Sequence, residues 1–380
     1  MNDSRPSLPR ILHLHSSFGT GGKELRCVTL INAFGGDAEH IIISADPAAM
    51  GAAKLIDPAI SVAYPADFPL LQGRPTPPRL YRLAQAMRGY DLVLTYNWGA
   101  MDAALAHSLF ASRLCLPPLV HHEDGFNEDE RERLKRRRNW ARRIGLVSAG
   151  TVIVPSRTLE RIALTKWHIP VARIQQIPNA IDVGAFTDLP RPDAIPGLVK
   201  QDGQKWVGTM AGLRKVKDLP YMVSAFAALP EEWQLVIVGE GEEKGAIRER
   251  AEALGIADRV HLPGFVADPA SCVGLFDIFA LSSHSEQFPI SMLEAMAAGV
   301  PVASPAVGDV LDMVSDENRP LVLPRAHLQS VLCQLAADPQ MRALLGEANR
   351  RKAAAEFDST RMISRYRAIY FGAMGRYVAA

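Results

Sequence analysis

The sequence has few cysteines and almost no net charge. Its 380 residues include 4 cysteines, and no two of them form a Cys-x-x-Cys pair. We therefore expect neither a zinc site nor a disulfide framework, and we expect reduced thiols in a cytoplasmic protein. A net charge of +1 provides no overall electrostatic attraction for nucleic acid.

Long apolar runs and one common metal motif are also missing. No stretch of about 18 apolar residues occurs, so no transmembrane helix is predicted. Residues 1–10 are polar and lack the apolar core of a secretory signal. The chain contains no Asp-x-Asp, so a metal ion held by that motif is not expected.

What the sequence does contain is an alternation of short apolar runs with helical segments. This pattern predicts parallel, doubly wound α/β sheets. At 380 residues the chain is too long for one ordinary core, which favours two such domains. The strand candidates are residues 11–15, 40–44, 91–95, 119–121, 151–155, 206–211, 234–238, 259–262, 278–281 and 301–304.

The domain boundary is predicted from a proline-rich stretch. Residues 187–197 contain three prolines and read as an interdomain linker. The expected domains are therefore 1–186 and 187–357. A final helix at about 358–380 has an apolar side that can pack back on the first domain.

The most informative segment is 282–304, where a strand is followed by a polar loop and a helix. We predict that the helix begins near Pro289, which suits a first helical position, and ends at Gly299. The backbone N–H groups of Phe288, Ile290 and Ser291 would then point out of the helix start. Such groups offer partial positive charge to a diphosphate.

Two carboxylates belong to the same segment. Glu286 precedes the helix and Glu294 lies about one turn inside it, and helical side chains lean toward the N-terminus. Both can therefore face one crevice and accept hydrogen bonds from sugar hydroxyls. The alternative is a loop carboxylate and an exposed helical residue with no shared role.

The segment resembles a known family signature. Glu286-x7-Glu294, followed by Ala-Met-Ala-Ala-Gly-Val-Pro-Val, looks like that of the retaining GT-B glycosyltransferases of family 4, also called glycosyltransferase group 1. One departure is Gln287, where members often have glycine, which affects how closely the backbone approaches the donor sugar. Further landmarks resemble the family in the same order, namely residues 178–182, 211–218, 238–241 and 260–265.

The resemblance implies a fold and an activity. The fold is two Rossmann-like domains facing across a cleft, with the acceptor on the N-terminal side and the nucleotide sugar on the C-terminal side. The activity is retaining transfer from a nucleoside diphosphate sugar to a glycan or lipid-linked acceptor, in cell-surface polysaccharide or glycoconjugate synthesis. No cofactor and no metal is expected.

The resemblance also assigns donor-side roles. Arg214 and Lys217 would bind the donor diphosphate in place of a metal, because arginine forks onto phosphate oxygens and lysine adds a mobile charge. Glu286 would hold the sugar hydroxyls and Glu294 the nucleotide ribose. A solvated basic loop is the alternative for the two cations. The remaining expected donor contacts are the residues that open the helix, Phe288, Pro289, Ile290 and Ser291.

In the first domain, polar and glycine-rich loops follow three strands. Gly21 and Gly22 match the family loop that contacts the donor diphosphate or the acceptor, although a plain turn is equally compatible. His121 matches the family histidine that contacts the sugar at the reaction centre. The acceptor side has three candidates, which are Asn97, Trp98 and, as a rival to His121 in register, His122.

The basic run 131–143 holds eight arginines and lysines. It is read first as a solvated helix face, and the alternative is a patch for anionic lipid on the inner face of the membrane.

Three other functions are compatible with a two-domain α/β chain. They are a nucleotide-sugar epimerase, a dinucleotide-dependent oxidoreductase and a non-catalytic sugar-nucleotide binding protein. Asp46 ends the second strand as a ribose-binding acid would, but the glycine spacing at 19–22 is wrong for a dinucleotide loop.

Overall fold

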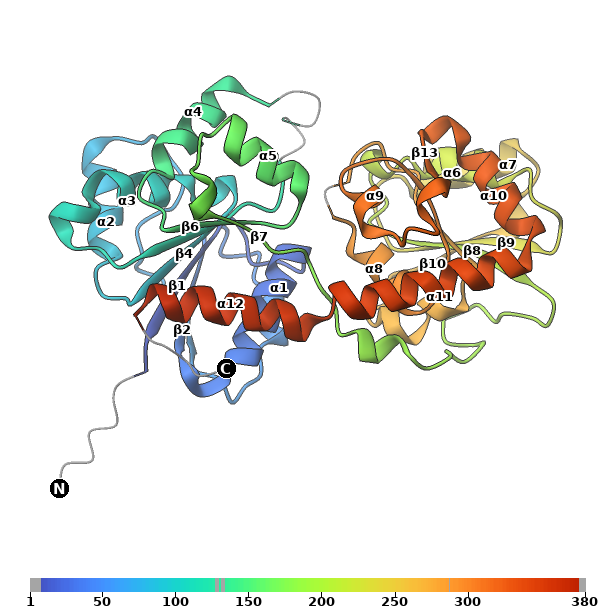
Figure 1. Ribbon diagram of the computed structural model, residues 1–380, viewed down its shortest axis with the longest axis horizontal. Helices are drawn as coiled ribbons and strands as arrows, with labels where there is room; N and C mark the ends of the chain where they lie inside the picture. The colour runs from blue at the N-terminus through green and yellow to red at the C-terminus, as the bar shows by residue number, and fades with distance from the viewer. Residues whose placement is uncertain (1–7, 127–129, 131–133, 287, 376–380) are drawn as a thin grey trace. The chain divides into compact units, whose positions relative to one another are not determined.

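The computed structural model describes residues 8–126, 130, 134–286 and 288–375, and the chain divides into two compact units (Figure 1). Unit 1 contains the described residues up to Pro178 and those from Arg361 onward, and unit 2 is Asn179–Thr360. Each unit has one parallel β-sheet with helices around it. The predicted α/β class with two Rossmann-like units is confirmed.

Unit 1 has a seven-stranded sheet in the order β3-β2-β1-β4-β5-β6-β7. Its central strands are buried along most of their length, as expected of strands covered on both faces. The strands are β1 (Arg10–His15), β2 (Glu39–Ser44), β3 (Val62–Ala63), β4 (Leu92–Tyr96), β5 (Leu119–His122), β6 (Thr151–Val154) and β7 (Ile174–Gln176). The helices are α1 (Gly22–Phe34), α2 (Pro77–Ala86), α3 (Met101–Leu114), α4 (Arg136–Gly145), α5 (Arg157–Thr165) and the C-terminal α12 (Ser359–Ala373).

The C-terminal helix α12 packs on unit 1. Phe34 of α1 makes edge contacts with the rings of Tyr370 and Phe371, at centroid distances of 5.9 and 5.8 Å. The Tyr370 hydroxyl is also 2.7 Å from Nε2 of His122 on β5. Aromatic burial and a buried hydrogen bond therefore attach the end of the chain to its first half.

Unit 2 has a six-stranded sheet in the order β10-β9-β8-β11-β12-β13. The strands are β8 (Lys205–Met210), β9 (Trp233–Val238), β10 (Val260–Gly264), β11 (Ile278–Ala280), β12 (Val302–Pro305) and β13 (Val322–Leu323). The helices are α6 (Leu219–Phe226), α7 (Lys244–Ala253), α8 (Ile290–Ala297), α9 (Val310–Met313), α10 (Leu328–Ala337) and α11 (Pro339–Glu356). None of the described helices has the length and apolar character needed to cross a bilayer.

The boundary between the units lies at Pro178, before the predicted position at 186/187. Ile181 pairs with Asp358 in a β-bridge, and the buried Val183 and Phe186 belong to a core of unit 2. The proline-rich stretch 187–197 also lies within unit 2, where Ile195 is fully buried. The linker interpretation of 187–197 is therefore wrong, because apolar residues around it are packed into the second core.

The ten predicted strands are all present, with ends that differ by one or two residues. The pattern did not reveal β3, β7 and β13, which have only two or three residues each and lie at or near sheet edges. Segments this short carry too few alternating side chains to be distinguished from loops.

Gly208 provides a test of the packing of unit 2. A Cβ atom at this position of β8 would lie 2.1 Å from Cγ of the buried Phe276 ring. We expect Gly208→Ala to lower the free energy of unfolding by about 1–3 kcal/mol through overpacking, measured by urea denaturation.

The matched control is Gly245→Ala on α7, where a Cβ would meet nothing within 4 Å. This change should be neutral or stabilising by up to about 1 kcal/mol. Equal unfolding midpoints for the two variants would contradict the described packing of β8.

Candidate functional site

The candidate site in unit 2 lies where the strand order reverses. Strands β9 and β10 follow β8 on one side, whereas β11, β12 and β13 lie on the other. Because β8 and β11 pair in parallel, the loops that leave their carboxyl ends emerge side by side. In open parallel sheets ligands bind at this position.

The loop after β8 is supported by the loop after β9. The Leu213 amide donates to the Glu240 carbonyl at 2.9 Å. A Cβ on Gly239 would lie 1.9 Å from the Ala211 carbonyl oxygen, and one on Gly241 would lie 2.4 Å from that of Leu213. Only glycine permits so close an approach of two backbones, which explains the Val-Gly-Glu-Gly landmark.

The two predicted diphosphate cations lie in the loop after β8. Arg214 precedes a short 3₁₀ turn, Lys215–Lys217. The Arg214 side chain is exposed, and among the described residues no carboxylate pairs with it. Lys217 differs, because 15% of its side chain is exposed and it forms an ion pair. One cation is therefore open to a ligand and the other is anchored.

The anchored lysine joins the two loops. Nζ of Lys217 donates to Oε1 of Glu286 at 2.6 Å, and the Ser283 hydroxyl donates to the same oxygen at 2.6 Å. Among the described residues no donor is bonded to Oε2 of Glu286. The ammonium group has three N–H donors, so Lys217 can hold Glu286 and a phosphate oxygen together.

Further bonds hold the same two loops together. The Ser282 hydroxyl donates to the Lys217 carbonyl at 2.8 Å, and the His284 amide donates to the Val216 carbonyl at 2.9 Å. Asp218 follows in a left-handed conformation, with φ of 44°, and its carboxylate pairs with Arg325. The positions of Lys217 and Glu286 are therefore set by backbone contacts as well as by their own ion pair.

Helix α8 begins directly after this loop. It starts at Ile290, with Pro289 at the N-cap in an extended conformation and not at the predicted first helical position. The side chains of Phe288 and Pro289 are buried, and Phe288 makes an edge contact with Phe357. Only their backbone groups can therefore reach a ligand. Ser291 and Ile290 are half-buried in the first turn, where amides lack intrahelical acceptors.

Gln287 lies outside the described residues. At the other end of the helix, Gly299 has φ of 75° and its amide donates to the Met296 carbonyl, which confirms the predicted glycine stop.

Glu294 lies on α8 in a largely apolar setting. Burial, with a smaller contribution from the Asp268 carboxylate, raises the pKa of Glu294 to about 7. The two residues that flank it on each side, Met292 and Leu293 before it and Ala295 and Met296 after it, are fully buried. Among the described residues no hydrogen-bond donor is paired with Glu294. Its carboxylate is thus a half-buried acceptor for which the described part of the chain supplies no donor.

In unit 1 the strand order reverses between β1 and β4, and a cavity of about 670 Å³ lies beside the loops that follow these strands. The predicted acceptor-side residues Asn97 and Trp98 line it together with Lys23 and Ser16. A Cβ on Gly99 would lie 2.1 Å from Cβ of Ser16, so glycine is required where the loops touch.

The predicted donor glycines open the helix beside the same loop. Gly21 is the N-cap of α1, and Gly22 is its first residue. Both are exposed, so their backbones are accessible in unit 1.

His121 is enclosed in a charged network of unit 1. Its Nδ1 lies 2.9 Å from the Thr95 hydroxyl, and its Nε2 is 3.7 Å from Oε2 of Glu123. Arg142 donates to that same carboxylate oxygen at 2.8 Å. His121, Glu123 and Arg142 are all fully buried. The catalytic role of His121 stays a prediction, and contact with a sugar requires the ring to become accessible.

Arg142 belongs to the basic run but is not solvated. Its guanidinium lies 5.2 Å from the ring centroids of Trp98, Phe126 and Trp167. The reading of the whole run as a solvated face is therefore wrong for Arg142, which stacks among aromatic rings and pairs with Glu123. Arg131 and Arg133 lie outside the described residues.

The acceptor-side role of His122 stays a prediction, and its ring is covered within unit 1. Its ring stacks on Tyr96 at 4.4 Å, its Nε2 bonds to Tyr370, and it is 1% exposed. The covering helix α12 lies far along the chain, which is why the sequence did not reveal this burial.

Sequence reasoning also missed the pair of Arg26 and Asp124. They form two hydrogen bonds between α1 and the loop after β5. The sequence did offer one indication, because Arg26 stands among the apolar residues of the buried side of α1.

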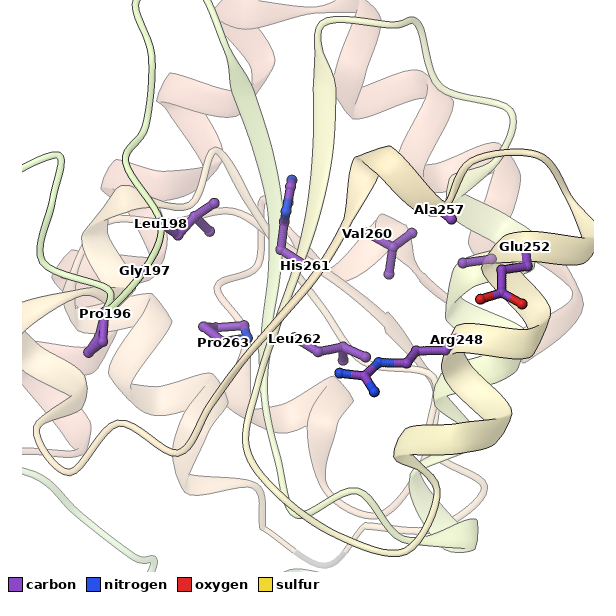
Figure 2. Close-up of a pocket in the computed structure, with 11 residues that line it drawn as sticks. Pro196, Gly197, Leu198, Arg248, Glu252, Ala257, Val260, His261, Leu262 and Pro263 are labelled. Atoms are coloured by element: carbon purple, nitrogen blue, oxygen red, sulfur yellow. The ribbon is translucent and has the colours of Figure 1, made fainter.

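Another cavity, of about 400 Å³, lies between α7 and β10 of unit 2 (Figure 2). Arg248 and Glu252 of α7 and His261 of β10 are among its lining residues. None of the predicted donor residues lines it. It therefore does not belong to the site at the ends of β8 and β11.

Two models of glycosyltransferase families match this chain. The family model for Glycosyltransferase Family 4 matches residues 20–184, and that for Glycosyl transferases group 1 matches residues 190–352. Together they cover most of both units.

Two curated relatives have related sequences. N-acetyl-alpha-D-glucosaminyl L-malate synthase of Bacillus anthracis is 28% identical over 238 residues, which span 60% of this chain and 61% of that protein. The 2-deoxystreptamine N-acetyl-D-glucosaminyltransferase of Streptomyces fradiae is 30% identical over 202 residues, which span 48% of this chain and 45% of that protein. The chain thus matches about half to three fifths of the length of these relatives.

Among solved structures, Anabaena HepE in complex with UDP is similar with a TM-score of 0.78. The identity is 21%, and the match covers 95% of this chain and 99% of that chain. This similarity shows a shared fold.

The raised pKa of Glu294 yields a pH-dependent stability. The folded state keeps its proton up to about pH 7, whereas the unfolded carboxyl loses it near its ordinary value of 4.5. Stability therefore falls as pH rises through this window, by roughly 2–3 kcal/mol. We expect Glu294→Gln to gain that amount relative to the wild type between pH 5 and pH 8, measured by urea unfolding.

The control is Glu249→Gln, a change of an exposed carboxylate on α7. Its stability should differ from that of the wild type by less than about 0.5 kcal/mol at each pH, because substitutions of exposed side chains have small effects. If the Glu294→Gln difference were equally constant, the carboxylate would not be buried as described.

Proposed function

Since the chain belongs to glycosyltransferase family 4, we propose that it transfers a sugar from a nucleoside diphosphate sugar to a glycan or lipid-linked acceptor. The observation that carries this proposal is the contact of Lys217 with Glu286 at the switch point of unit 2. It brings the cation proposed for the phosphates and the carboxylate proposed for the sugar together at one sheet edge. The similarity to HepE, solved with UDP, supports uridine as the nucleoside to test first.

The leaving diphosphate develops negative charge as the bond to the sugar breaks. Arg214, whose side chain is exposed and unpaired among the described residues, would fork onto its oxygens. Lys217 would add a second positive charge while it stays bonded to Glu286. The amides of Ile290 and Ser291 at the start of α8 point to the same kind of ligand. These groups act together in place of a metal ion in the proposed chemistry.

The two carboxylates have different proposed partners. Oε2 of Glu286, with no bonded donor among the described residues, would accept hydroxyl groups of the transferred sugar. Glu294 would accept the ribose hydroxyls, and its buried carboxylate gains donors in doing so. Donor binding at Glu294 is therefore expected to strengthen as pH rises through about 7, because the ionised form accepts the stronger bonds.

The stereochemical course is proposed to be retention. The acceptor hydroxyl would attack the anomeric carbon from the face that the diphosphate leaves. Its proton would pass to a departing phosphate oxygen, so no protein nucleophile is needed. The cavity beside Asn97 and Trp98 in unit 1 is the proposed place for the acceptor.

The donor site can be tested by comparing substitutions of Arg214 and of its neighbour Lys215. Both are exposed cations in the same loop. We expect Arg214→Ala to weaken binding of UDP about 10- to 100-fold, because two charge-assisted hydrogen bonds are lost. Lys215→Ala should change binding less than threefold. Isothermal titration with UDP measures both.

The two variants should also differ in their rate of UDP-glucose turnover. This rate is measured as UDP release in the presence of a panel of glycan and lipid acceptors. Arg214→Ala should be strongly impaired and Lys215→Ala should not. If UDP, GDP, ADP and dTDP all fail to bind, or if the two variants bind equally, the proposed donor site is wrong.

We also propose that α4 contacts an anionic membrane, at the inner face for a cytoplasmic protein. Apolar side chains are exposed on this helix, with Trp140 at 61% and Ile144 at 47%, and just after it, with Val147 at 62%. Arg136, Arg143 and Lys166 line a cavity of about 740 Å³ that Trp140 also lines. An exposed tryptophan among cations is typical of an interfacial helix.

Sedimentation with liposomes tests the membrane contact. The chain should pellet with phosphatidylglycerol vesicles, less so at high salt, and not with phosphatidylcholine vesicles. Trp140→Ser combined with Arg143→Glu should reduce the bound fraction at least threefold. Leu344→Ser on α11, which changes another exposed apolar side chain, should leave it unchanged. Equal pelleting of the two variants would exclude α4 as the contact.

A further inference from the structure

A buried cluster of two histidines and one cysteine, residue types that commonly bind metals, lies next to the glycine-rich loop of unit 1. His13 and His15 are two residues apart in β1, so their side chains share one face of the sheet. Cys27 of α1 packs on that face. The three are at most 2% exposed, and one ligand atom from each lies within 4.8 Å of the others.

The distances between ligand atoms of His13, Cys27 and Tyr96 match those found around a bound metal ion. Nδ1 of His13 is 3.4 Å from Sγ of Cys27 and 3.2 Å from the hydroxyl oxygen of Tyr96. The same hydroxyl is 3.6 Å from Sγ of Cys27. Tetrahedral Zn²⁺ with its usual bond lengths separates neighbouring ligand atoms by roughly 3.3–3.7 Å.

In metal-bound histidines the ring nitrogen that does not bind the metal usually makes a hydrogen bond, and His13 has such a bond. Its Nε2 lies 3.0 Å from Nδ1 of His40 on the neighbouring strand β2. A proton on Nε2 that is donated to His40 leaves the Nδ1 lone pair directed toward Cys27 and Tyr96. This outer hydrogen bond fixes the tautomer and the ring orientation of a ligating histidine.

Hydrogen bonding alone does not account for His15. Its ring is fully buried against Tyr96, at a centroid distance of 3.9 Å, and neither ring nitrogen has a partner. A buried polar atom left without a partner costs about 1–3 kcal/mol. A histidine ring nitrogen of this kind can instead bind a transition-metal ion.

We propose that His13, His15 and Cys27 bind one transition-metal ion, with Zn²⁺ as the expected metal and the Tyr96 hydroxyl beside it. Imidazole and thiolate ligands select this class over Mg²⁺ or Ca²⁺. The ion would join β1 to α1 and would lie outside the transfer chemistry proposed for unit 2. Binding displaces the Cys27 thiol proton, which leaves to solvent as the thiolate bonds to the metal.

Cobalt substitution tests the site on the full chain. We expect one Co²⁺ per chain after dialysis, with a thiolate-to-cobalt charge-transfer band and the intense visible bands of a four-coordinate ion. Zn²⁺ should displace the Co²⁺ and should raise the thermal midpoint of unfolding. Metal analysis of the zinc-loaded chain should give one Zn²⁺.

Matched cysteine variants assign the ligand. Cys27→Ser should abolish the charge-transfer band and weaken Co²⁺ binding at least tenfold. Cys272→Ser, which changes a buried free cysteine of unit 2, should leave both unchanged. A band that persists in Cys27→Ser overturns the proposal.

The wild-type chain alone is also decisive. Should it retain no Co²⁺ or Zn²⁺ at micromolar concentration, the group is a metal-free hydrogen-bonded cluster and the proposal is wrong. This outcome does not depend on whether the variants fold, and it leaves the donor site of unit 2 untouched.

Discussion

The ion pair of Lys217 with Glu286 is the contact on which the candidate donor site depends. Its two members come from loops that are far apart in sequence and adjacent in space because β8 and β11 pair in parallel. Both side chains are mostly buried, so removing either partner leaves an uncompensated charge near the sheet edge. Ser283 shares the same carboxylate oxygen, which leaves one acceptor oxygen of Glu286 for a ligand.

Unit 1 repeats the topology of unit 2 but places different chemistry at its switch point. Its interior near β5 holds a buried arginine, Arg142, among three aromatic rings, bonded to Glu123. Such an arginine is stable only because its charge is paired and its flat faces are covered. This network fixes the loop after β5, which carries Asp124 toward Arg26. Arg142 also contacts the ring of Trp98, which lines the cavity of unit 1.

The sequence predicted the parts of this molecule that local pattern controls. Buried strands, the glycine stop at Gly299 and the placement of Glu286 before a helix all follow from residues close together in the chain. Three features were not predictable in this way. The domain boundary at Pro178 depends on Ile181 meeting Asp358, the burial of His122 depends on Tyr370 of the last helix, and Arg142 is enclosed by rings from three separate segments.

Dependence on distant residues also explains why the spacing of the cysteines did not predict a metal site. A zinc motif is read from closely spaced ligands, whereas His13, His15 and Cys27 converge only when α1 packs on β1. Short edge strands and tertiary clusters share this property, because their signal lies in contacts between distant residues. The meeting of Lys217 and Glu286 at the sheet edge was predictable, because each stands in a short, continuous loop after a recognisable strand.

The central claim is that the loops after β8 and β11 hold a diphosphate. A crystal structure of the chain with bound UDP tests this most directly. In that structure both phosphates should lie within hydrogen-bonding distance of Arg214, Lys217 and the first turn of α8, with the ribose at Glu294. A nucleotide found in the cavity between α7 and β10, with Arg214 turned to solvent, would contradict it.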